Sequence, residues 1–205
     1  PKLPSNLKYL HYGFQGCDSL TTLTPLPNGI MSAVGAYCSC IGLKDLSDFV
    51  IPSTCERAGG MFMGCEKLIA APKISQGVKE IGSMFHMCTS LKTAPKIPNG
   101  VTVMGGCFAD CTSLINPPVI PDSVTQMNGT FQNCVNLKTA PKIPNKVELL
   151  QAAFNGCTSL TKAPDIPQSA YNIERMFQNC KSLTGDIQVS TNTSAHDGFL
   201  RGVPN

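Results

Sequence analysis

The chain has 205 residues and a mass of 21.8 kDa; 42% of the residues are hydrophobic and 14% are charged. The 16 Lys and Arg against 13 Asp and Glu give a formal net charge of +3, too weak a bias to predict binding to nucleic acid or attraction to a membrane surface. The apolar content argues against disorder, and no apolar run approaches the roughly 18 residues of a membrane-spanning helix.

The chain opens in the middle of a repeating unit, because Pro1-Lys2-Leu3-Pro4 matches Pro95-Lys96-Ile97-Pro98. It has no initiating Met, and no basic segment followed by an apolar one, as a secretory signal peptide would need. We therefore expect that further residues once preceded Pro1.

One pattern repeats along the whole chain: an aromatic residue followed three positions later by Cys. It occurs eight times, at Phe14/Cys17, Tyr37/Cys40, Phe62/Cys65, Phe85/Cys88, Phe108/Cys111, Phe131/Cys134, Phe154/Cys157 and Phe177/Cys180. We call the eight cysteines of these pairs the ladder cysteines. Neighbouring ladder cysteines are 23 residues apart, except for Cys40 and Cys65, which are 25 apart. A fixed period of this length is the signature of a solenoid of stacked units.

Other positions keep the same register relative to the ladder cysteine. Leu stands three residues after it in every unit, a branched aliphatic residue stands 14 before it, and Pro stands 13 before it in every unit but one. One unit cannot bury so many apolar side chains alone. Neighbouring units are therefore expected to stack around a continuous core.

The two extra residues of the 25-residue spacing fall between Leu46 and Ile51. Leu46 keeps its usual distance from the cysteine before it, and Pro52 keeps its distance from the cysteine after it. We expect the segment Ser47-Asp48-Phe49-Val50 to form a bulge in a strand or turn.

Within one unit, the segment Leu91–Ile97 predicts a short strand that pairs in parallel with its equivalents, although Pro95 has no N–H to donate and limits this pairing. Apolar residues at 101, 104 and 108 approximate helical spacing, which two glycines at 105 and 106 weaken. We therefore expect a 3-10 turn or one or two helical turns over 101–108. Glycines before the Val or Ile position predict turns with positive φ. They are Gly29, Gly77 and Gly100.

The period of 23 lies in the leucine-rich-repeat range of about 20 to 29 residues. The predicted fold is a leucine-rich-repeat solenoid, an α/β-type superhelix with short parallel strands on the concave side and 3-10 or short helical turns on the convex side. We expect a single domain over 1–205, with regular repeats over 1–183 and an irregular last repeat or cap over 184–205.

Phe-x-x-Cys-x-x-Leu followed by an Ile-Pro step and a Val position resembles the BspA-type leucine-rich repeat, from Pro1 to about Leu183. That family occurs in surface and secreted proteins of oral and gut bacteria, and its members are similar to adhesins that bind host matrix proteins. The resemblance implies an extracellular or cell-surface location and a host or extracellular protein or glycan as partner. The Ala-Pro step, as at Ala94-Pro95, departs from the commoner aliphatic form and alters the expected strand geometry.

The ladder cysteines suit neither a metal site nor disulfides. Sulfur atoms in parallel rungs would lie about 4.8 Å apart, whereas zinc needs four converging ligands and a disulfide needs Cβ atoms about 3.8 Å apart. We expect these thiols to be reduced and buried. Cys55 and Cys107 replace core residues. Cys38 shares a polar position with His86 and Gln132, so it is the candidate for a solvent-facing free thiol.

No catalytic or cofactor-binding motif occurs in the sequence. The three His are scattered, and no Ser/His/Asp or Cys/His pair shows a recognisable spacing. We therefore predict a protein that is not an enzyme and needs no metal or cofactor, with a redox protein or enzyme that uses Cys38 as the alternative.

Lysines recur four and eight residues after the ladder cysteine, interrupted by residues such as Val119 and Asp165. If the strand alternates, they project with their neighbours from the concave surface, where solenoids usually bind ligands. The candidate binding residues are Lys73, Lys92, Thr93, Lys96, Asn116, Lys138, Thr139, Lys142 and Lys162. The stripe is either a solvated face that keeps the array soluble or a docking stripe for an acidic ligand or a protein.

Together these features favour a non-enzymatic, exported, adhesin-like module that presents a concave surface to a protein or glycan. The alternative is a structural spacer that holds another domain away from the cell surface. We expect no nucleic-acid partner and no insertion of this segment into a membrane.

Overall fold

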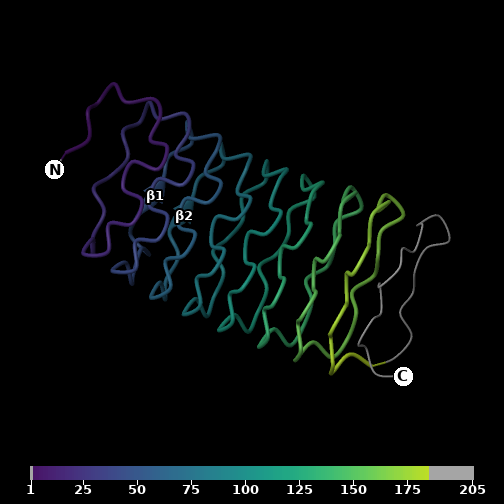
Figure 1. Cartoon of the computed structure of the whole chain (residues 1–205). Helices are drawn as coiled ribbons and strands as arrows, with labels where there is room; N and C mark the ends of the chain where they lie inside the picture. Colours follow the sequence, from purple (N-terminus) through teal and green to yellow (C-terminus); the bar gives the residue numbers. More distant parts are fainter. Residues whose placement is uncertain (1, 185–205) are drawn as a thin grey trace.

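In the computed structural model, which describes residues 2–184, the chain winds into coils that lie side by side from one end to the other (Figure 1). Each coil is one repeat unit, because backbone hydrogen bonds join residues in neighbouring units, as between Ile81 N–H and the Val103 carbonyl oxygen at 2.9 Å. The architecture is thus the predicted solenoid. The expected cap at 184–205 lies outside the described residues, apart from Thr184.

Two strands are formed in the described part of the chain. β1 (Val50–Ile51) and β2 (Lys73–Ile74) pair in parallel, with Val50 opposite Lys73 and Ile51 opposite Ile74 (Figure 1). In the segments equivalent to 91–97, the other pairings are two isolated bridges, Asp45 with Ala70 and Thr93 with Asn116. Prolines in these segments remove the N–H groups that a ladder needs. The predicted strands form where Ser75 replaces the usual proline, because its N–H bonds to the Ile51 carbonyl oxygen at 3.2 Å.

The continuous parallel ladder runs elsewhere, eight residues before each ladder cysteine. Its single-residue bridges join successive coils through Tyr9, Ser32, Arg57, Glu80, Val103, Gln126, Leu149 and Asn172. This column lies in the part of the unit for which helical turns were predicted. The prediction that the strands lie in the segments equivalent to 91–97 was therefore wrong for most of the molecule.

The described residues contain no α-helix and no 3-10 helix, so the prediction for 101–108 was also wrong. Alternate N–H groups bond within the coil, as from Cys107 to the Met104 carbonyl oxygen at 3.0 Å, or to the next coil, as from Gly106 to the Asn128 oxygen at 2.8 Å. Two residues in each coil, five and one before the ladder cysteine, have positive φ, such as Gly106 at 64° and Asp110 at 59°. These left-handed residues turn the chain before a helix can form.

One of the three glycines expected to need a positive φ has it, Gly100 with φ 123°. Gly29 and Gly77 do not. Gly77 is needed for a different reason, because a Cβ there would collide with the carbonyl oxygen of Ser53 in the preceding coil.

The core is built from columns of equivalent residues. The aromatic rings of successive coils stack with centroids 5.4 to 6.0 Å apart and planes within 14° of parallel. The Leu, Val and Ile positions predicted from the register are buried beside this stack from Ile30 to Leu183, except that Ile74 is partly buried. The prediction of one continuous core is confirmed in the described residues.

The two extra residues lie where the register placed them, because Asp45 pairs with Ala70 but Val50 pairs with Lys73. They form a turn closed by a hydrogen bond from Phe49 N–H to the Leu46 carbonyl oxygen at 2.9 Å. The turn directs the Phe49 ring into the core, edge-on to Tyr37 and Phe62. The insertion therefore adds a core residue.

Candidate functional site

The ladder cysteines lie in a column under the turns. Seven of their thiols donate hydrogen bonds to the carbonyl oxygen of the aromatic residue in the preceding coil, at 2.9 to 3.2 Å. Desolvation raises the pKa of Cys65, Cys111 and Cys180 to about 12 and that of Cys55 to about 11. These thiols stay neutral at physiological pH, which leaves them without the thiolate that nucleophilic chemistry needs.

The placement of the accessible thiol was wrong. Cys38 is buried, because short side chains at its position, including Ala109, stay within the layer whereas the longer Gln132 reaches solvent. The exposed thiol is that of Cys17, in the first coil. Cys55 and Cys107 are buried in the core as predicted.

In the described residues, no three His, Cys, Asp or Glu side chains lie together so as to hold a metal ion. His86 lies 3.7 Å from the Asp110 carboxylate, and Asn133 donates a hydrogen bond to the other oxygen of that carboxylate at 2.9 Å. This cluster joins neighbouring coils at the surface.

The candidate binding residues lie on one side of each coil, which we call the proline face. In each coil it comprises the fourth to tenth residues after the ladder cysteine. Examples are 92–98, 115–121 and 138–144. Residues before proline are held extended and proline itself donates no hydrogen bond. Consequently, beyond the bridge between Thr93 and Asn116, no backbone N–H from 117 to 123 or from 139 to 146 bonds to a neighbouring coil. From 116 onward the coils are therefore joined here at few points, such as the bond from Lys138 N–H to the Ile115 carbonyl oxygen at 3.5 Å, and grooves open between them.

All nine predicted binding residues are exposed. The lysines among them form no ion pair with any described residue. The ion pairs of the described residues involve Lys79, His86 and Arg175. The proline face thus offers cationic groups that no acidic side chain of the described chain neutralises.

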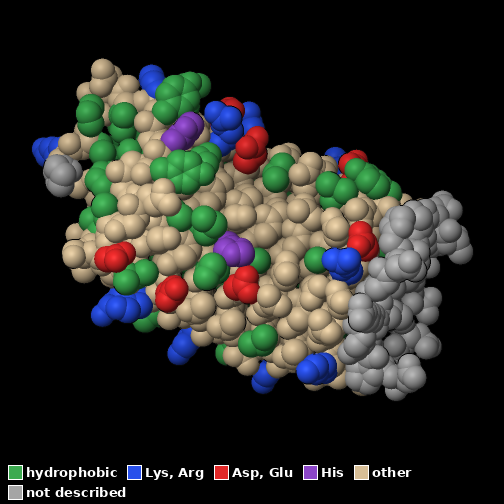
Figure 2. All heavy atoms as spheres, viewed as in Figure 1, with side chains coloured by type: hydrophobic (Ala, Val, Ile, Leu, Met, Phe, Trp, Pro, Cys, Tyr) green, Lys and Arg blue, Asp and Glu red, His purple; other side chains and the backbone are tan. Residues whose placement is uncertain are grey.

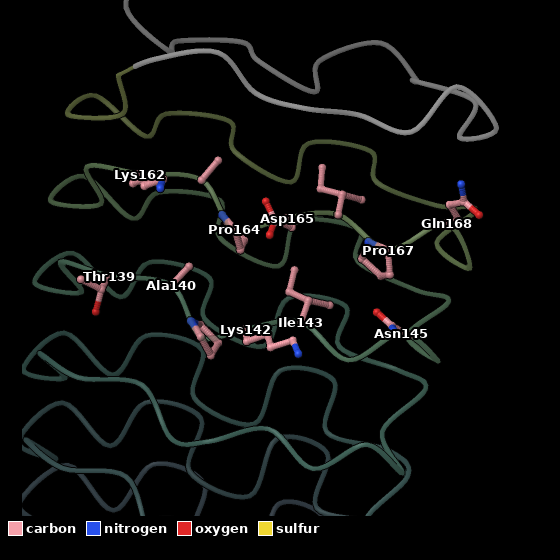
Figure 3. A pocket seen from close by; sticks show the side chains of 13 residues that line it. Thr139, Ala140, Lys142, Ile143, Asn145, Lys162, Pro164, Asp165, Pro167 and Gln168 are labelled. Atoms are coloured by element: carbon pink, nitrogen blue, oxygen red, sulfur yellow. The ribbon is translucent and has the colours of Figure 1, made fainter.

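Three of the predicted residues, Thr139, Lys142 and Lys162, line one groove of about 540 Å³ between two coils (Figure 3). The Ala, Pro and Ile residues of the two coils make its floor apolar. They are Ala140, Pro141, Ile143, Ala163, Pro164 and Ile166. Figure 3 shows Thr139 and Lys162 toward one end and Asn145 toward the other. Asp165 lines the same groove, so its rim carries both signs of charge.

Lys92 and Lys138 line a second depression, of about 410 Å³, on either side of Ile115. Lys142 also borders a third groove of about 460 Å³, together with Val119 and several prolines. Four further predicted residues are not among those that line these grooves. They are Lys73, Thr93, Lys96 and Asn116.

Sequence reasoning missed the apolar part of the site. Ile115, Val119 and the prolines between them line these grooves, yet Val119 was treated only as a gap in the lysine column. The sequence did carry a signal for this apolar part: Val119 is an apolar residue at a position that is Lys in neighbouring units and was predicted to be exposed.

On the face drawn in Figure 2, charged side chains are scattered over a largely neutral surface. This distribution agrees with the low charged fraction of the sequence.

With the coil geometry and the repeated Phe-x-x-Cys columns established, comparison with known families is decisive. The family described as BspA type Leucine rich repeat region (6 copies) matches residues 2–115 and 105–199. The chain belongs to this family. No curated protein and no solved structure matches the chain.

BspA-type repeat proteins are commonly associated with the cell surface. In the described part of this BspA-type chain, no helix has the length and apolar character to cross a membrane.

Proposed function

We propose that this BspA-type chain is a non-enzymatic, exported, adhesin-like module that binds a protein or glycan through its proline face. The observation that carries the proposal is the arrangement of that face. Exposed, unpaired lysines stand over apolar grooves on a side where few hydrogen bonds join the coils. The family's association with cell surfaces supports an extracellular or surface location.

A binding screen against extracellular-matrix proteins and glycans tests this function, with a Lys96→Glu/Lys142→Glu variant alongside. Both lysines are exposed, so the variant should fold. We expect a saturable hit that the variant loses. A hit that the variant retains would place the site elsewhere and contradict the role of this face.

The second candidate function is a structural spacer. It is favoured by the ring stack and the bridge column, which continue through the described coils and join them into one core. Absence of any binding at micromolar concentration in the screen would favour the spacer.

A further inference from the structure

One coil of the proline face interrupts both lysine positions with an apolar residue. Ile115 is 42% exposed and stands between Lys92 and Lys138 in the neighbouring coils; Val119 is 87% exposed and stands between Lys96 and Lys142. Ile115, Val119 and the intervening Pro117 form what we call the apolar strip. The flanking lysines are Lys92, Lys96, Lys138 and Lys142.

We propose that the apolar strip and the flanking lysines bind an extended acidic segment of a partner protein in which apolar side chains alternate with carboxylates. This inference rests on the proposed binding function and gives it a partner chemistry. Apolar side chains of the segment contact the strip. Its carboxylates point away from the strip, and the long side chains of the flanking lysines reach them from either side.

The dimensions of the strip suit one extended chain. Ile115, Pro117 and Val119 stand at every second position, and an extended partner also presents side chains to one side at every second residue, about 7 Å apart. Coils bonded about 4.8 Å apart would place the two lysine rows about 10 Å apart, and separation of the coils on this face widens that distance, so one extended chain fits between the rows. The depressions of about 410 and 460 Å³ at the two ends of the strip can receive side chains.

The charges select an acidic partner. The flanking lysines have no ion-pair partner among the described residues, and one carboxylate, Asp122, lines the groove at the Val119 end. Exposed ion pairs contribute only about 0 to 1 kcal/mol each, so charge alone gives weak binding. Contact with the apolar strip supplies the remainder, which favours a peptide with apolar side chains over an anionic glycan.

The test titrates the whole chain into a fluorescein-labelled peptide of about eight residues, alternating Glu and Leu, long enough to exceed the strip. Fluorescence anisotropy should show saturable binding that weakens as salt is raised. Ile115→Thr/Val119→Ser should weaken it at least about tenfold, and Lys96→Glu/Lys142→Glu likewise. The matched controls are Met31→Thr/Tyr171→Ser, which removes exposed apolar side chains that lie off the proline face, and Lys67→Glu/Lys146→Glu, which makes the same charge change. Both should bind within about twofold of wild type.

Three comparison probes make the result decisive: an all-Glu peptide, heparin, and vesicles containing phosphatidylserine. Equal binding of the all-Glu peptide or heparin, unaffected by Ile115→Thr/Val119→Ser, would overturn the strip while leaving a lysine-based binding module. Preferential binding of the vesicles would overturn it in favour of a membrane surface. No peptide binding alongside a lysine-dependent hit in the matrix and glycan screen would overturn the strip and leave the proposed function standing.

Discussion

In the seven coils from Phe14 to Phe154, the carbonyl oxygen of the stacked aromatic residue accepts two hydrogen bonds. That of Phe85 accepts one from Cys88 N–H at 3.0 Å, in its own coil, and one from the Cys111 thiol at 3.1 Å, in the next. The same pair of bonds recurs along the stack, so both acceptor sites of a buried oxygen are occupied. Cys suits this position because it is small and apolar and still carries a donor.

Tyr37 is the aromatic of the stack that carries a hydroxyl. Its ring is buried between Phe14 and Phe62, and its hydroxyl oxygen has no hydrogen-bond partner among the described residues. An unsatisfied buried hydroxyl costs about 1 to 3 kcal/mol. We therefore expect Tyr37→Phe to raise the free energy of unfolding by about 1 kcal/mol, measured by urea denaturation followed by circular dichroism.

Tyr12→Phe provides the matched control, since Tyr12 is 54% exposed and its hydroxyl can be hydrated. It should leave the urea midpoint unchanged. Loss of stability in Tyr37→Phe would show that the hydroxyl finds a partner and would contradict the packing described.

At the scale of one coil, the left-handed residue five before the ladder cysteine is often Gly but is Ala152 in one coil, with φ 54°. A left-handed L-residue costs about 1 to 2 kcal/mol, which Gly avoids at some expense in unfolded-state entropy. Ala152→Gly should therefore stabilise the chain by roughly 0.5 to 1 kcal/mol. Ala153→Gly, one residue on, is buried without positive φ and should destabilise it. Equal destabilisation by both, in urea melts, would rule out the left-handed turn.

The coil also shows what the sequence could and could not predict. Core positions and the insertion site follow from a register that every unit repeats, so both were predicted correctly. The turn segment was mistaken for a helix because a chain of turns closed over three residues, as from Cys107 to Met104, also places apolar residues three or four apart. The lysines of the proline face were predicted as exposed, but the grooves were not, since they depend on how neighbouring coils separate at Pro118 and Pro141.

At the scale of the whole molecule, the two sides of the stack differ. Backbone hydrogen bonds join every described coil to the next along the turns, whereas the proline face is largely unbonded. The first holds the solenoid together, and the second provides its accessible grooves. Ring stacking and thiol bonds add to the bonded side, so the stability of the solenoid depends on the column of buried cysteines.

That dependence predicts alkaline sensitivity. Burial raises the pKa of nine cysteines above the ordinary value of 9.0, for example that of Cys65 to about 12. At a pH between the ordinary thiol pKa and the raised pKa of the folded chain, the unfolded chain binds fewer protons than the folded one. The free energy of unfolding therefore falls as pH rises, by up to about 1.4 kcal/mol per pH unit for each thiol. Guanidinium midpoints should fall steeply from about pH 8.5 to 10. Cys107→Ala introduces the residue that stands at the equivalent position 153 in another coil. In this variant the midpoint should fall less steeply with pH, because one titrating thiol is missing. A midpoint constant across this range would contradict burial of the column.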